Sequence, residues 1–66
     1  MSTAKMVGDT VEVLMPAGTW VPGKILLIEE DDEGPSVVVV LTSDWRAYRV
    51  GDKVWVYHYE VRHAAA

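Results

Sequence analysis

The 66-residue sequence predicts an all-β fold, a small antiparallel sheet that closes on itself around one core. Half of the residues are apolar, with many valines and no phenylalanine, which suits strands more than helices. A phrase also occurs twice, as VGDTVEV from Val7 and as VGDKVWV from Val50. No stretch holds a convincing helical period. Two such strand entries in so short a chain favour a closed sheet.

Each copy of the phrase predicts a tight turn that leads into a strand. Glycine gives the turn its backbone freedom, and the aspartate is expected to hydrogen-bond backbone two residues further on. The period of two then places Val11 and Val13 on one face of the first strand, and the valines of the second copy on one face of theirs. The copies differ in what they turn outward, which is Glu12 in the first and Trp55 in the second.

The remaining elements follow from turn residues and alternation. Pro16 and Gly18 predict a turn after the first strand, and Pro22 suits an edge or a bulge in the second. The second strand is apolar on both sides, so it either bends across the barrel or carries a second face at a subunit interface. A helical turn is expected at 58–59. The predicted strands are 9–15, 20–30, 36–42, the second phrase through 57, and 60–62.

The alternation also predicts the core. The side chains expected to point inward are Val11, Val13, Ile25, Leu27, Val38, Val40, Val54, Val56 and Val61.

Composition predicts one domain over residues 7–63, with a flexible leader at 1–6 and a disordered tail at 64–66. The chain has no cysteine, which excludes disulfides and thiolate metal sites and fits a cytoplasmic location. No apolar run approaches the ~20 residues of a membrane span, and no signal peptide precedes the first strand, so we expect no membrane partner.

Four segments carry a resemblance to a known family: VGDTVEVL, GTWVPGKI, VVVVL and VWVYHYEVR. In this order they resemble Src-homology-3-like (SH3-like) barrels, and within that group the Tudor and Agenet domains, over residues 6–63. The resemblance implies a single five-stranded antiparallel barrel. It also implies an aromatic cage for methylated lysine or arginine, in which ring faces attract the cation. Met15 and Val21 stand where the family usually has aromatic residues, so the matching positions leave a partial cage of Trp20, Asp44, Trp45 and Tyr48.

The aromatic residues of the last third predict a contact surface. If the valines of the final long strand point inward, Trp55 and Tyr57 point outward, and rigid rings of this kind are favoured at interfaces. The alternative is that the rings only cover the flank of a small barrel. We expect a non-catalytic binding or adaptor module that contacts a protein or peptide partner, or copies of itself, as a homo-oligomer. The candidate binding residues are Trp20, Asp44, Trp45, Tyr48, Trp55 and Tyr57.

Two other functions stay open. A small nucleic-acid-binding barrel would use the basic side chains beside the aromatics, although a net charge of −4 disfavours it. The chain also resembles, more weakly, the plasmid-borne type II dihydrofolate reductases, in the order of Gly-Asp, an early Trp and a late Val-x-Val-Tyr strand. That resemblance implies a tetramer with one active site in a central pore. Trp55 takes the place of a small polar residue there, and the pore lysine has no clear counterpart. The basic residues that the nucleic-acid-binding alternative would use are Lys24, Arg46, Arg49, Lys53 and Arg62.

No motif predicts a catalytic residue, a metal or a cofactor. The acidic run 29–33 lacks the spacing of a calcium loop and is expected to be a solvated hairpin tip, with a basic partner as the alternative. His58 and His63 match no familiar zinc spacing. Neither an activated nucleophile nor a phosphate-binding glycine loop is present in the sequence.

Overall fold

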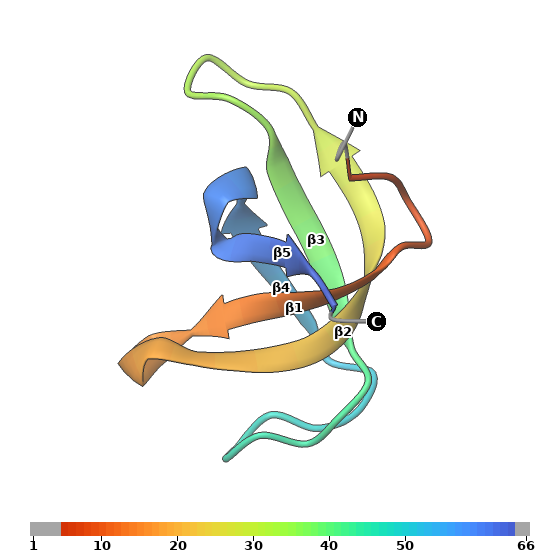
Figure 1. Cartoon of the computed structure of the whole chain (residues 1–66), viewed down its shortest axis with the longest axis vertical. Helices are drawn as coiled ribbons and strands as arrows, with labels where there is room; N and C mark the ends of the chain where they lie inside the picture. The colour runs from red at the N-terminus through yellow and green to blue at the C-terminus, as the bar shows by residue number, and fades with distance from the viewer. Residues whose placement is uncertain (1–4, 65–66) are drawn as a thin grey trace.

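A computed structural model describes residues 5–64, and residues 1–4 of the predicted leader and 65–66 of the predicted tail lie outside this range. The described chain is all-β, and its five strands form one antiparallel sheet in the order β4-β3-β2-β1-β5 (Figure 1). Short 3-10 turns, η1 (Pro16–Gly18) and η2 (His58–Glu60), precede β2 and β5. The strands are β1 (Thr10–Met15), β2 (Thr19–Glu29), β3 (Ser36–Leu41), β4 (Lys53–Tyr57) and β5 (Val61–His63).

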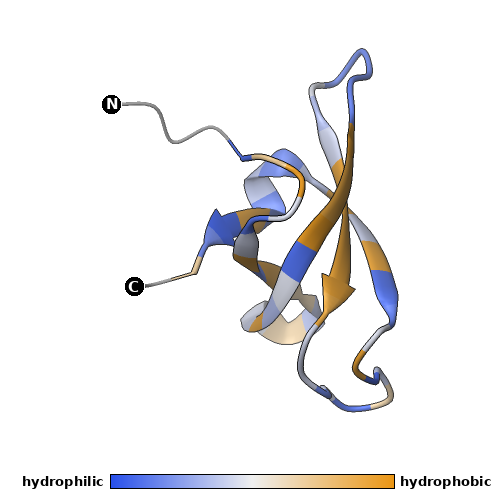
Figure 2. Ribbon diagram, turned by 90° about the vertical axis from the view of Figure 1, so that its right-hand side faces the viewer, coloured by the Kyte–Doolittle hydropathy of each residue, from blue (hydrophilic) through white to orange (hydrophobic). Residues whose placement is uncertain are grey.

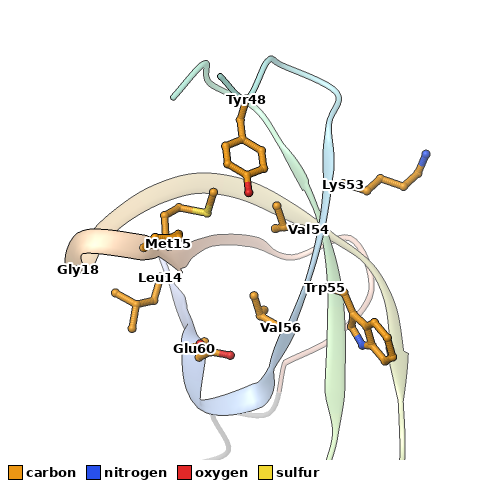
Figure 3. A pocket seen from close by; sticks show the side chains of 10 residues that line it. Leu14, Met15, Gly18, Tyr48, Lys53, Val54, Trp55, Val56 and Glu60 are labelled. Atoms are coloured by element: carbon orange, nitrogen blue, oxygen red, sulfur yellow. The ribbon is translucent and has the colours of Figure 1, made fainter. Parts of the chain in front are cut away.

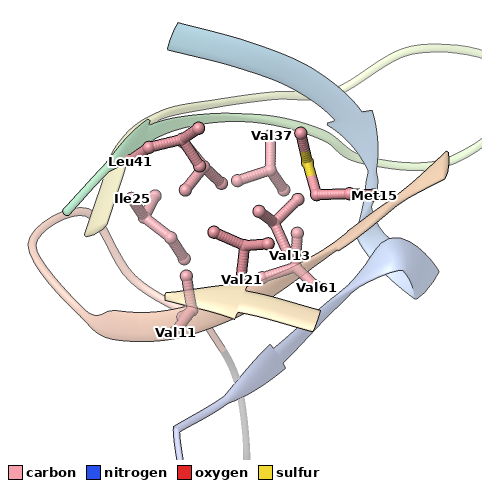
Figure 4. Close-up of a cluster of buried hydrophobic side chains, with 9 residues drawn as sticks. Val11, Val13, Met15, Val21, Ile25, Val37, Leu41 and Val61 are labelled. Carbon is pink, nitrogen blue, oxygen red and sulfur yellow. The ribbon is translucent and has the colours of Figure 1, made fainter. Parts of the chain in front are cut away.

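The sheet curls so that all of its strands contribute to one core (Figure 4). Within residues 5–64, β4 and β5 are the two edges of the sheet, and no ladder joins them. Val54 and Val56 of β4 are half-buried and pack against the core from that edge. The fully enclosed side chains are Val11, Val13, Met15, Val21, Ile25, Val37, Val39, Leu41 and Val61.

The predicted core is wrong in β3 and in the second half of β2. Val37 and Val39 are buried, whereas Val38 and Val40 were expected inside, and Leu27 is exposed. A β-bulge between Ile25 and Leu27 causes the shift in β2, because one extra residue turns the following side chains to the opposite face. In β3 the continuous run of valines has no alternation from which the inward face could be chosen.

The repeated Val-Gly-Asp phrase forms the same turn twice. Gly8 has a φ of 93° and Gly51 a φ of 94°, and each lies between a backbone pair that closes a four-residue turn. Asp9 N donates to Met6 O over 3.0 Å, and Asp52 N donates to Arg49 O over 2.9 Å. A left-handed third residue is typical of a type II turn, and glycine adopts it without steric cost.

The aspartate side chains reach backward rather than forward. The Asp9 carboxylate accepts from Met6 N, and the Asp52 carboxylate accepts from Arg49 N, each over 2.9 Å. The predicted bond to the backbone two residues further on is therefore wrong. In both copies the carboxylate of the fourth turn residue accepts a hydrogen bond from the amide of the first turn residue.

Each turn then continues into a β-bulge that is hydrogen-bonded to the neighbouring strand. Gly8 N donates to Ile25 O, and Ile25 N donates to Asp9 O, so two residues oppose one. In the second copy Gly51 N donates to Leu41 O, and Leu41 N donates to Asp52 O. We name these two arrangements the turn clamps. They hold β2 at Ile25 and β3 at Leu41.

Gly23 lies where β2 passes close to Val39 and Val40 of β3. A Cβ atom built on this buried glycine would lie 2.5 Å from Val39 Cγ1 and 2.9 Å from the Val40 carbonyl oxygen. The second contact is with backbone, so a rotamer change in Val39 would not relieve it. Glycine is therefore required here by a close approach of two strands.

We expect Gly23→Ala to destabilise the protein by about 2 kcal/mol, the usual cost of forcing extra atoms into a packed core. Thr19→Ala, at an exposed position of the same strand, serves as the control and should change stability little. Urea denaturation followed by far-UV circular dichroism measures both. Equal stability of the two variants would contradict the close approach.

We expect the stability of the protein at acid pH to depend on the Asp9 carboxylate of the first turn. The Met6 amide, and then His63 Nε2 at 3.2 Å, lower the pKa of Asp9. The stability from this carboxylate is thus complete above the ordinary aspartate pKa of about 3.9 and is lost as the pH falls through the lower folded-state pKa. Asp9→Asn should lower stability at neutral pH and reduce the loss on acidification.

Urea denaturation between about pH 7 and pH 2 measures this difference. The comparison variant is His63→Gln. It keeps the hydrogen bond from Met6 N to the Asp9 carboxylate, which is the largest cause of the lowered pKa of Asp9. It should retain most of the acid dependence. If Asp9→Asn and the native chain lose stability in parallel, the turn carboxylate does not contribute.

Candidate functional site

The candidate site is the outward surface of β2, β3 and β4, which we name the outer face. Val38 lies opposite Leu27 on one side and Trp55 on the other, which forms an apolar row across three strands. Val40 lies between Lys24 and Lys53 in the next row. Outward-pointing residues of these strands, with the bulged Leu26, make up the face: Lys24, Leu26, Leu27, Glu29, Val38, Val40, Lys53, Trp55 and Tyr57.

Trp55 is the most exposed large apolar side chain of this face. Its relative accessible surface is 72%, although it lies in the middle of a strand. Leu26 and Leu27 are also exposed, because the bulge in β2 turns consecutive leucines away from the core. Large apolar side chains gathered on one strand surface are typical of a contact site rather than of scattered exposure.

Tyr57 extends the aromatic surface toward η2. Its ring stacks on the ring of Tyr59, with centroids 5.7 Å apart and an interplanar angle of 7°. The His58 ring meets Tyr59 edge-on at 5.6 Å. The stack gives the face a rigid aromatic border.

Charge is unevenly distributed along the outer face. Lys24 and Lys53 flank one end, in the row that contains Val40. Glu29 lies at the other end, where β2 enters the acidic tip formed by residues 29–33. Figure 2 shows the hydrophobic stretches of these strands next to the hydrophilic tip of the β2–β3 hairpin. The face is thus apolar in the middle, basic at one end and acidic at the other.

Trp45 and Tyr48 lie in the loop between β3 and β4, where they pack against the core. Their rings lie 6.1 Å apart, and their backbones form a two-way bridge, with each amide donating to the carbonyl of the other residue. The Arg46 guanidinium lies over the Trp45 ring at 4.8 Å. Both aromatic rings are half-buried, so they hold this loop against the core of the sheet.

Asp44 closes the same loop from its other side. Its Oδ1 accepts from Val50 N over 2.8 Å. Arg49 Nη1 donates to the carbonyl oxygens of Arg46 and Tyr48, over 2.8 and 3.2 Å. The side chains of Asp44 and Arg49 are therefore bonded to the backbone of the loop.

Trp20 belongs to a different surface. It pairs with Leu14 of β1, and the Arg62 guanidinium lies 4.1 Å above its ring. Arg62 Nε also donates to Glu12 Oε1 over 2.8 Å. The six predicted site residues thus fall into three groups: Trp55 and Tyr57 on the outer face, the loop residues Asp44, Trp45 and Tyr48, and Trp20 with Arg62.

Two positions at which Tudor domains usually have cage aromatics are core positions in this fold. Met15 and Val21 are both buried, and Trp20 is covered by Arg62. Among the described residues, the paired rings are Trp45 with Tyr48, Tyr57 with Tyr59, and His58 with Tyr59. The described geometry provides no ring pair that includes Trp20.

A groove lies along the free edge of β4, facing the end of β1 and η1. Its volume is about 550 Å³, and Figure 3 shows Tyr48 and Glu60 directed toward it, while the Lys53 and Trp55 side chains point away. Glu60 Oε1 accepts from Tyr57 N over 3.0 Å. Sequence reasoning missed Glu60, because its partner amide becomes evident only once η2 is formed. Leu14, Met15, Val54 and Val56 contribute the apolar lining.

The described residues hold neither a metal-binding cluster nor a helix that could span a membrane. Between residues 5 and 64 no group of three or more His, Cys, Asp or Glu side chains could hold a metal ion. In the same part of the chain, neither short helical turn is long or apolar enough to cross a membrane. The outer face offers exposed rings, aliphatic side chains and separated charges.

We expect Asp44→Ala to destabilise the protein by about 1 kcal/mol, because the Val50 amide loses its acceptor. Asp32→Ala, at an exposed position of the hairpin tip, is the matched control and should have little effect. Thermal unfolding followed by circular dichroism measures both. An Asp44→Ala variant as stable as the control would show that the carboxylate does not hold the loop.

In comparisons with family models, curated proteins and solved structures, the chain matches no family model, no curated protein and no solved structure. The outer face is therefore interpreted from its own geometry. It combines a tryptophan exposed at mid-strand with an apolar row and charged ends.

Proposed function

We propose that this protein is a small non-catalytic binding module that contacts a protein partner through its outer face. The observation that supports this most directly is the 72% exposure of Trp55, which lies at the β4 end of a three-strand apolar row. Tryptophan is enriched among the few residues that dominate binding energy at protein interfaces, where neighbouring apolar side chains exclude water from it.

The exposure of Trp55 also bears on the alternative that the aromatic rings merely cover the barrel. A covering ring would lie flat on neighbouring side chains and lose most of its accessible surface, as the half-buried Trp45 does. Trp55 keeps most of its surface in contact with solvent. Its exposure supports an interface role over a covering role.

The strand order supports an SH3-like barrel as the finer description of the fold. A 3-10 turn leads from β4 into β5, and β5 pairs with β1, so the last strand lies beside the first. We propose that the curled sheet is a barrel of this class. Its outer face is then a barrel flank that a partner covers.

The basic side chains support a nucleic-acid surface less well. Arg62 is engaged with Glu12 and Trp20, and Arg49 donates to loop carbonyls. Lys24 and Lys53 do lie on the outer face, but the same face ends at an acidic tip. A polyanion would be repelled at that end. The proposal therefore remains a protein partner.

The test compares two tryptophans. Proteins from the source cell are captured on the full-length chain, and a captured protein is purified and titrated against the native chain, Trp55→Gln and Trp20→Gln. We expect Trp55→Gln to bind roughly thirtyfold more weakly, the loss that an interface hot spot causes. Trp20→Gln should bind as the native chain does.

Circular dichroism of both variants verifies that they fold. If every captured protein binds the two variants with equal affinity, the outer face is not the contact surface. Tight binding of a random single-stranded oligonucleotide that declines steeply with salt would instead support the nucleic-acid alternative.

A further inference from the structure

The charges of the outer face are arranged along the strands in a way that complements a reversed copy of the same face. Lys24 and Lys53 share the row at one end, and Glu29 lies at the other. The acidic tip extends past the end opposite the two lysines, whereas the β3–β4 loop, which extends past the lysine end, carries two arginines and two aspartates (Figure 1). The face therefore has opposite charge at its two ends.

We propose that the partner of the outer face is a second copy of this chain, stacked face to face and head to tail around a two-fold axis that runs across the strands. This inference rests on the proposed binding function of the face and specifies its partner. A symmetric dimer places the same patch on both copies, so the patch must complement itself.

Two sheets that stack face to face with their strands aligned can be related by a two-fold axis in the interface that runs either along the strands or across them. An axis along the strands would place Lys24 of one copy over Lys53 of the other, and both acidic tips at the same end. An axis across the strands places Lys24 over Glu29 of the other copy. Charge therefore selects the second arrangement, because like charges across an interface are repulsive.

The middle of the face suits the same arrangement. The row of Leu27, Val38 and Trp55 carries no charge and lies on the axis, so each copy buries its row against the same row of the other. Lys53 of one copy then lies over Tyr57 of the other, an ammonium group over an aromatic ring. Apolar contacts would supply affinity, and the charged ends would set the orientation.

The face is large enough for this role in so small a protein. Stable interfaces bury about 800 Å² on each partner. That area is less than a fifth of the 4503 Å² of accessible surface of the chain. The outer sides of three of the five strands, β2, β3 and β4, with their exposed leucines and rings, are available to supply it.

Sedimentation equilibrium of the full chain over a range of concentrations tests the proposal. We expect a monomer–dimer equilibrium that weakens as sodium chloride is added, and a monomer for Trp55→Gln. A native chain that is monomeric at every concentration overturns the proposal. That outcome leaves the proposed binding function intact, because a different protein would then occupy the face.

Lys24→Glu distinguishes the two orientations. In the head-to-tail dimer the introduced carboxylate of each copy lies over Glu29 of the other copy, so like charges meet at two places. We therefore expect roughly tenfold weaker dimerisation at low salt. The double variant Lys24→Glu/Glu29→Lys should restore dimerisation. Arg62→Glu, an equal change of charge on β5, should leave it unchanged.

The opposite axis predicts the reverse result, because Glu at position 24 would then face Lys53. Tighter dimerisation of Lys24→Glu, or a dimer that persists in Trp55→Gln, overturns the head-to-tail arrangement. Circular dichroism of each variant confirms that a change in association is not a loss of fold.

Discussion

The two turn clamps are the constraint on which the rest of the sheet depends. In each, a glycine with positive φ and the following aspartate share one residue of the neighbouring strand, Ile25 in β2 and Leu41 in β3. A strand held at one residue by two backbone bonds cannot slip by a single position without breaking both of them. Because a slip of one residue exchanges the two faces of a strand, the clamps fix which side chains enter the core.

The outer face is a consequence of this register together with the bulge in β2. The bulge adds a residue after Ile25, so that Leu26 and Leu27 both reach the outside, and Val38 and Trp55 align with Leu27 across the sheet. The apolar row arises because three strands are held in a register that turns these side chains to the same side.

The all-β class and the repeated turn could be predicted from sequence, because the Val-Gly-Asp phrase specifies its own geometry within a few residues. The inward faces of β1 and β4 were also predictable, since their valines alternate with polar or aromatic residues. The uniform valines of β3 and the bulge at Leu26 carry no local signal, so the predicted core failed there.

Trp55 was identified by the same alternation that placed its neighbours inward. The grouping of Trp20 with Arg62, and of Asp44 with Val50, depends on contacts between distant segments or on loop shape. No pattern in the sequence specifies those contacts.

The contact of Glu60 with the Tyr57 amide has a consequence for aggregation. β4 is an edge strand with an exposed tryptophan, and such an edge can recruit strands from other molecules in an uncontrolled, fibre-like manner. The Glu60 carboxylate occupies the amide that an added strand would need near the end of β4. The same side chain brings negative charge to this edge, which disfavours an incoming backbone carbonyl. The Glu60 carboxylate therefore hinders the addition of a strand at the free edge of β4, while Trp55 stays exposed on the outer face.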